Sequence, residues 1–157
     1  MRVTGCDTLG MRAEEIIERL GLVPHPEGGH YAETWRGPAG SDGRAIATAI
    51  HFLLRAGERS HWHRVDADEI WLHHAGAPLV VSIADAAARS SVDHVLGSDL
   101  AAGERPQVRV PAHAWQAAAT TGEWTLVSCI VAPGFEFDGF ELAAPDWSPS
   151  ADSAGTD

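Results

Sequence analysis

Short apolar runs separated by turns rich in Gly, Pro and Asp fill the chain after residue 21, and they constrain its fold more than any other feature. Short runs at this spacing are typical of a sandwich or barrel of antiparallel strands. Residues 84–90 are compatible with a helical turn as well as a loop. The predicted strands cover residues 30–35, 45–54, 60–63, 68–74, 79–83, 92–96, 107–110, 115–119, 123–131 and 140–142. We therefore expect an all-β protein.

One short helix is predicted at the N-terminal side of these strands, over residues 11–20. Ile16, Ile17 and Leu20 recur there at helical spacing. Gly21 follows in the position where a helix end favours a left-handed residue.

The length of 157 residues allows one well-buried core but not two ordinary domains. We predict a single domain over residues 11–143. Residues 1–10 are predicted to form a flexible leader, and residues 144–157, rich in Pro, Ser and Asp, a flexible tail.

The formal net charge of -11 argues against binding to nucleic acid or to an anionic membrane surface. Two cysteines make no disulfide framework, and the first residues lack the pattern of a secretory signal. These features predict a cytoplasmic protein that binds a small-molecule ligand.

The stretch from Gly57 to Gly76 holds four of the nine histidines. His61 and His63 are two residues apart, so on a regular strand both imidazoles would leave the same face. With Glu69 they predict a divalent-metal site of the two-histidine, one-carboxylate kind. Asp68 is the competing carboxylate, because neighbouring residues of a strand face opposite sides.

The same stretch resembles the first cupin motif, which is Gly, His-x-His, Glu and Gly in that order. The sequence in and around this motif is similar to the DUF985 (cupin_5) group of the cupin superfamily. The similar segments include residues 25–31, Asp68-Glu69-Ile70-Trp71 and residues 103–107. The resemblance covers roughly residues 20–142. It implies a double-stranded β-helix, an RmlC-like jelly roll with a pocket in the barrel mouth, and a homodimer.

The resemblance also implies a second motif, whose final histidine would be a metal ligand. Gln116 stands at that position in this chain, while His113 is expected at the surface or rim. The implied ligand set is His61, His63, Glu69 and the weaker donor Gln116. The expected cofactor is one divalent transition metal, Fe, Mn, Ni or Zn.

Three further side chains are candidate proton carriers. Tyr31 and Glu33 would share one face of their strand, and His51 lies within an apolar run. An ordinary hydrogen-bonded strand edge and a core histidine are the alternatives for these residues. Residues 25–29 are expected to form a structural loop whose glycines permit positive φ.

Candidate substrate contacts are His73, Trp71 and Trp115. His73 would share the face of Glu69, or lie at a strand end near a dimer edge. The tryptophans would wall the pocket or fill the core.

Three functions follow from these residues. The first is a metal-dependent cupin enzyme that isomerises or epimerises a small polar metabolite by acid–base chemistry. The second is an Fe(II)-dependent oxygenase that uses the same donors. The third is a non-catalytic module that binds or senses a small molecule.

Overall fold

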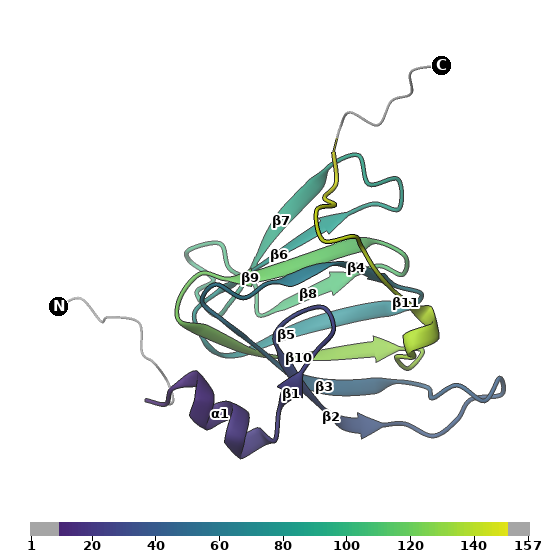
Figure 1. The fold of residues 1–157 in the computed structure, drawn as a ribbon, viewed down its shortest axis with the longest axis horizontal. Coiled ribbons are helices and arrows are strands. Elements are labelled where there is room, and N and C mark those ends of the chain that lie inside the picture. The colour runs from purple at the N-terminus through teal and green to yellow at the C-terminus, as the bar shows by residue number, and fades with distance from the viewer. Residues whose placement is uncertain (1–9, 151–157) are drawn as a thin grey trace.

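Antiparallel pairing of the short runs produces two packed β-sheets (Figure 1). The computed structural model describes residues 10–150. The larger sheet has the order β1-β2-β3-β10-β5-β8, with β1 Val23–Pro24, β2 His30–Arg36, β3 Thr48–Arg55, β5 Asp68–Gly76, β8 Gln107–Val110 and β10 Trp124–Ala132. The smaller sheet has the order β11-β4-β9-β6-β7, with β4 Ser60–Val65, β6 Leu79–Ala84, β7 Ser91–Leu96, β9 Trp115–Thr120 and β11 Phe140–Leu142. The predicted all-β jelly roll is confirmed.

The core lies between the two sheets, because alternate residues of each strand point inward. Phe52 and Trp71 of the larger sheet pack there with Leu79 and Val81 of the smaller sheet, and all four side chains are buried. The rings of Phe52 and Trp71 meet edge to face, with centroids 5.8 Å apart. These contacts hold the two sheets together.

Helix α1, Ala13–Leu20, covers part of the outer face of the larger sheet. Its buried residue Ile16 packs in one cluster with Leu53 and Trp124. The helix ends at Gly21, whose φ of 63° lies in the left-handed region that glycine adopts readily. The predicted helix is therefore confirmed. Within residues 10–150, no helix is long and apolar enough to cross a membrane.

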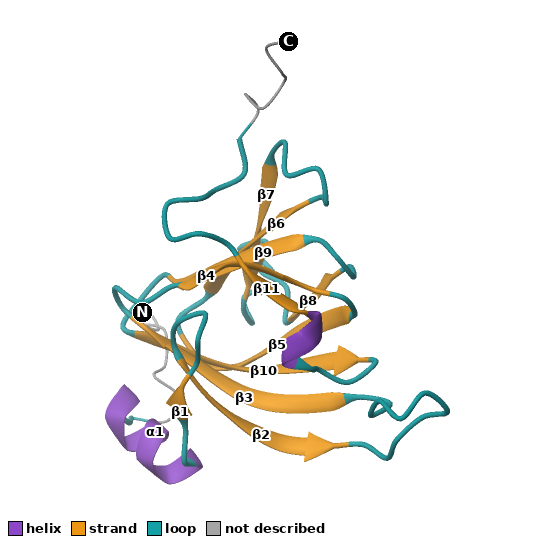
Figure 2. Cartoon of the chain, turned by 45° about the vertical axis from the view of Figure 1, so that its right-hand side comes forward, coloured by secondary structure: helices purple, strands orange, loops and turns teal. Residues whose placement is uncertain are grey.

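Some details of the fold differ from the expectations, most of them near the ends of the chain. The short strand β1 had no signal in the sequence, and residues 84–90 contain no helix. Residues 144–150 run along the smaller sheet as a loop (Figure 2), and Trp147 packs against Trp62 and Trp115. Residues 1–9 and 151–157, which carry most of the predicted leader and half of the predicted tail, lie outside the described residues.

Candidate functional site

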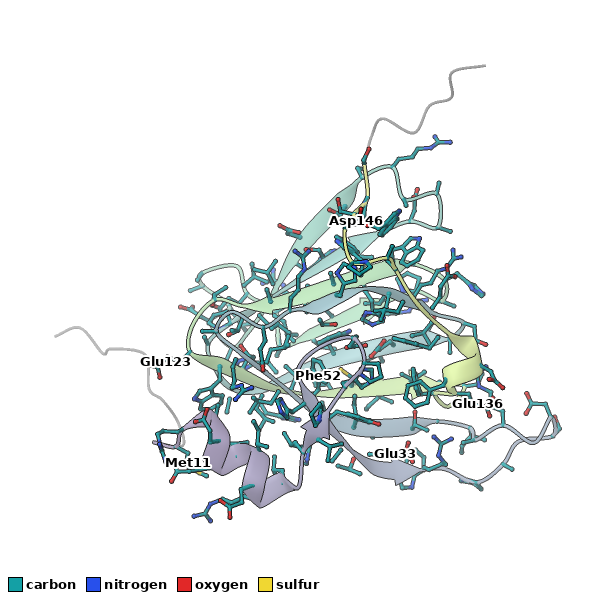
Figure 3. All side chains as sticks on the ribbon, in the orientation of Figure 1. Met11, Glu33, Phe52, Glu123, Glu136 and Asp146 are labelled. Atoms are coloured by element: carbon teal, nitrogen blue, oxygen red, sulfur yellow. The ribbon has the colours of Figure 1, made fainter. Side chains whose placement is uncertain are left out.

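A cavity of about 450 Å³ lies against both sheets and reaches Glu33 and Glu136, which are seen at one end of the barrel in Figure 3. Side chains from β2, β3, β4, β5 and β10 line it, together with the segments before β2 and after β10. Its larger apolar lining residues are Val23, Ile50, Val65, Val131, Phe135 and Phe137. Mostly apolar walls with few polar groups are usual for a small-molecule site. The polar groups therefore decide what chemistry the cavity can perform.

His63 is the histidine of β4 that faces this cavity, and its side chain is 2% exposed. Its Nδ1 lies 2.7 Å from the carbonyl oxygen of His61, so Nδ1 carries a hydrogen and donates it. Its Nε2 lies 3.2 Å from Oε2 of Glu27. Burial lowers the pKa of His63, against the attraction of Glu69. Nε2 and the Glu27 carboxyl are thus placed to share one proton.

Glu27 reaches the cavity from the loop between β1 and β2. The loop closes on itself through the backbone bond from Gly28 to His25, and docks on β4 through the bond from His61 N–H to the Glu27 carbonyl. Gly28 has a φ of 109° and lies so close to the Arg59 carbonyl that a side chain would collide with it. The Glu27 side chain is 10% exposed and accepts a 2.8 Å hydrogen bond from Ser60 Oγ. Burial raises the pKa of Glu27 to about 6.

Glu69 of β5 is the second carboxyl at the buried end of the cavity, and the residue is 7% exposed. Gln116 Nε2 donates a 2.6 Å hydrogen bond to its Oε2, and Trp71 Nε1 donates a 2.8 Å bond to Gln116 Oε1. Burial raises the pKa of Glu69 to about 7, and the charge of Glu27 acts in the same direction. Glu69 therefore titrates close to neutral pH, and the hydrogen bond from Gln116 fixes the orientation of its carboxyl group.

Cys129 of β10 also lines the cavity and is hydrogen-bonded to Glu69. Burial and the neighbouring carboxyls raise the pKa of its thiol well above the ordinary value. A thiol in this environment stays protonated and is a poor nucleophile.

The prediction that His61 and His63 share a face is wrong. Ser60 pairs with Ala118, whereas His63 pairs with Gln116, so β4 carries one extra residue in a bulge. The bulge turns His61 outward, where its Nε2 lies 2.8 Å from the carbonyl oxygen of Ala144. Ser60 and His63 instead face Glu27 together.

Two of the predicted proton carriers lie in the cavity, in different settings. Tyr31 lines it with its ring edge to face against His25, at a centroid distance of 4.5 Å. Glu33 lies nearer the mouth and binds Arg36 through two hydrogen bonds of 2.9 Å. The carboxylate of Glu33 is therefore held in an ion pair with Arg36.

The remaining candidates do not line the cavity. His51 lies on the outer face of the larger sheet, with its ring centroid 6.3 Å from that of His74. His73 turns toward the carbonyl of Ala77, at 3.3 Å, and Trp115 packs on the outer side of the smaller sheet under Trp147. Trp71 belongs to the core, and it is linked to the cavity by the hydrogen bond that it donates to Gln116.

The family model described as Cupin superfamily (DUF985), Cupin_5, matches residues 14–143. The chain belongs to the cupin superfamily. A protein of known structure from Shewanella oneidensis is 42% identical to this cupin with a TM-score of 0.81, and the match covers 85% of each chain. A hypothetical protein from Leishmania major is 34% identical with a TM-score of 0.78, over 85% of this cupin and 88% of that chain. No curated protein matches.

A more distant similarity shows the fold alone. A variant of oxalate decarboxylase from B. subtilis has 14% identity and a TM-score of 0.57. The match covers 76% of this cupin and 29% of that chain.

The predicted metal donors do not come together in this cupin. His61 points away from the cavity, and both polar atoms of the Gln116 amide are engaged by Trp71 and Glu69. Across residues 10–150, no group of three or more His, Cys, Asp or Glu side chains is arranged to hold a metal ion. Of the four predicted ligands, only His63 and Glu69 face the cavity, which does not fit the predicted site.

Glu27 and His25 were missed as site residues. Both belong to the sequence His-Pro-Glu-Gly-Gly, which predicts a structural loop when it is considered alone. The signal was the glycine pair, because Gly28 permits the close approach to β4 that carries Glu27 up to His63.

Proposed function

We propose that this cupin binds a small molecule in the cavity and isomerises or epimerises it by moving a proton at carbon. The observation that carries the proposal is the pair of carboxyls, Glu27 and Glu69, that line the cavity with His63 and have raised pKa values. Groups that titrate near neutral pH exchange protons efficiently with a substrate. Such perturbed groups in a cavity are a feature of catalytic sites.

Each group has a role that its contacts support. Glu69, held by Gln116, would act as the base that takes a proton from the substrate carbon. His63 and Glu27, whose Nε2 and Oε2 atoms lie 3.2 Å apart, would share a proton and return it to the substrate, either at a neighbouring carbon or on the opposite face of the same carbon. A proton taken and a proton returned leave the atoms of substrate and enzyme in balance, so no further reactant is needed.

Tyr31, which was predicted as a proton carrier, also lines the cavity, and in this proposal its hydroxyl would orient the substrate. Glu33 and His51 are replaced in the proposal by Glu27 and Glu69, because Glu33 is ion-paired and His51 is outside the cavity. The predicted Fe(II)-dependent oxygenase has weaker support, since His61, one of the three donors of its two-histidine, one-carboxylate site, is turned elsewhere.

The proposal is tested by hydrogen exchange in D₂O. The protein would be incubated with a library of small ketones, aldehydes, hydroxy acids and amino ketones, and carbon-bound deuterium measured by mass spectrometry. We expect uptake into one chemical group of compounds, reduced about a hundredfold or more in Glu69→Gln and in His63→Gln. The control is His51→Gln, which changes a histidine outside the cavity and should exchange at the wild-type rate.

Two results would contradict proton transfer. One is exchange no faster than in protein-free samples across the library, which would favour the alternative of a non-catalytic binding module. The other is exchange in Glu69→Gln that equals the wild type.

A further inference from the structure

The cavity has an unusual balance of charge for a site that opens to solvent. Its lining contains four carboxyl side chains, Glu27, Glu33, Glu69 and Glu136, but a single guanidinium, that of Arg36. The sequence contains no lysine. The charge of Arg36 therefore decides whether this lining could attract an anion.

Arg36 is ion-paired with a neighbour at the mouth. Its Nε and Nη2 donate to the two carboxylate oxygens of Glu33, each at 2.9 Å, and Nη2 also donates to the carbonyl of Phe135 at 3.2 Å. A fork-to-fork pair of this kind is the preferred arrangement of guanidinium and carboxylate. The carboxylate of Glu33 thus neutralises the charge that Arg36 would otherwise offer to an anion.

The two deep carboxyls have no such cation. Glu27 is hydrogen-bonded by the neutral hydroxyl of Ser60, and Glu69 by the neutral amide of Gln116. No ion pair joins either carboxyl to an arginine within residues 10–150, and their close basic neighbours are the histidines at 25 and 63. Above pH 7, where both carboxyls are ionised, negative charge is thus concentrated at the inner end, and low polarity there strengthens its attraction for a cation.

Aromatic side chains complete the enclosure. The rings of Phe135 and Phe137 meet edge to face with centroids 5.0 Å apart, and Tyr31 lines the cavity with them. Aromatic faces attract cations such as ammonium groups, in addition to the apolar contact that they provide. The walls therefore suit a ligand with an apolar body and a positive head.

We propose that the ligand of this cavity is a small organic cation, an amine or amidine with an apolar body, and that Glu33 sets this preference by occupying Arg36. The inference rests on the proposed use of the cavity as the ligand site. Anions such as nucleoside diphosphate sugars would meet uncompensated carboxylates and be rejected. The Glu33–Arg36 pair is a positioning and selectivity device, whereas Glu27 and Glu69 contact the ligand.

Three probes of nearly equal shape separate charge from size: benzamidinium, benzamide and benzoate. Dissociation constants would be measured by ligand-observed NMR and calorimetry at pH 8, above the pKa values of both deep carboxyls. We expect benzamidinium to bind about tenfold more tightly than benzamide, and benzoate not to bind at about 1 mM. Binding of benzoate as tight as that of benzamidinium would overturn the proposal, and so would the absence of binding by all three.

Variants then show which residues cause the preference for the cationic probe. Glu69→Gln should reduce the advantage of benzamidinium over benzamide to about threefold or less, with benzamide unchanged. Glu33→Gln should release Arg36 and allow benzoate to bind. Glu141→Gln is the matched control, because it breaks a surface pair with Arg64 that does not line the cavity. An unchanged probe ranking in Glu33→Gln would refute the role of that residue.

These measurements report binding and not turnover. A protein that prefers benzamidinium but exchanges no deuterium would retain the charge selectivity and lose the proposed proton transfer. A protein that exchanges deuterium into compounds without charge preference would retain the proposed proton transfer and lose the charge selectivity.

Discussion

Two neighbouring carboxyl groups on the two sides of strand β5 differ in burial and in the direction of their pKa shifts. Glu69 points into the barrel, is 7% exposed, and has a pKa raised by burial to about 7. Asp68 points outward, binds Arg109 at 2.7 Å and the Ala112 N–H at 2.8 Å, and has a pKa lowered mainly by the arginine. The side of the sheet, more than the type of residue, decides which carboxyl can take part in proton transfer at neutral pH.

The histidines repeat this contrast. His63 is held inside by a backbone carbonyl and Glu27, whereas His51 and His74 lie together on the outer face. The inner face offers few contacts with water, and the polar side chains of His63 and Glu69 there have hydrogen-bonding or charged partners. Three changes can sharpen or break this difference between the faces.

The largest effect is expected from Trp71→Ala on the inner side. The substitution removes a fully buried indole and leaves Gln116 Oε1 without its donor. We expect the free energy of unfolding to fall by about 4 kcal/mol, measured by urea denaturation. Trp35→Ala, at a tryptophan that is 49% exposed on β2, should cost less than about 1 kcal/mol. Equal losses in the two variants would remove the distinction between inner and outer side chains.

An intermediate effect is expected when Glu69→Gln is compared with Asp68→Asn across pH. The folded pKa of Glu69 lies above its ordinary 4.5, so its protonated form stabilises the fold below pH 4.5, and this contribution is lost as pH rises to about 7. Relative to wild type, Glu69→Gln should therefore gain about 3 kcal/mol of unfolding free energy between these limits.

Asp68→Asn is the counterpart with the opposite sign. The folded pKa of Asp68 lies below 3.8, so its charged form stabilises the fold above that pH and the contribution is lost on acidification. The variant should differ in slope from wild type only on the acid side. Thermal or urea unfolding at a series of pH values gives both curves, and parallel curves for Glu69→Gln and wild type would contradict the buried state of Glu69.

Short apolar runs separated by turn residues were sufficient to predict every strand except β1. The helix followed from the spacing of Ile16, Ile17 and Leu20 before Gly21. The resemblance to DUF985 cupins then implied the jelly roll, which the structure confirms.

The site was predicted only in part, for two physical reasons. The bulge in β4 moves His61 out of the face it would share with His63, and an irregular register leaves no mark on strand periodicity. Glu27 comes from a loop 36 residues before His63 in the sequence, so their approach to 3.2 Å depends on tertiary packing. Glu69, in the regularly paired part of β5, lines the cavity as strand alternation predicts.

The smallest effect is expected from His61→Ala, which tests the bulge directly. Because His61 turns outward to the Ala144 carbonyl, its loss should change the unfolding free energy by less than about 1 kcal/mol and leave metal content unaltered. Elemental analysis of wild type purified without added metal should give well below one equivalent, and added Zn²⁺, Mn²⁺, Ni²⁺ or Fe²⁺ should not raise the unfolding midpoint. His63→Ala is the matched inner variant and should be the more destabilising, since it leaves Glu27 Oε2 without its nearer histidine. A stoichiometric metal in wild type that disappears in His61→Ala would mean that both histidines face one ion, and the contrast between the two sides of β4 would then be lost.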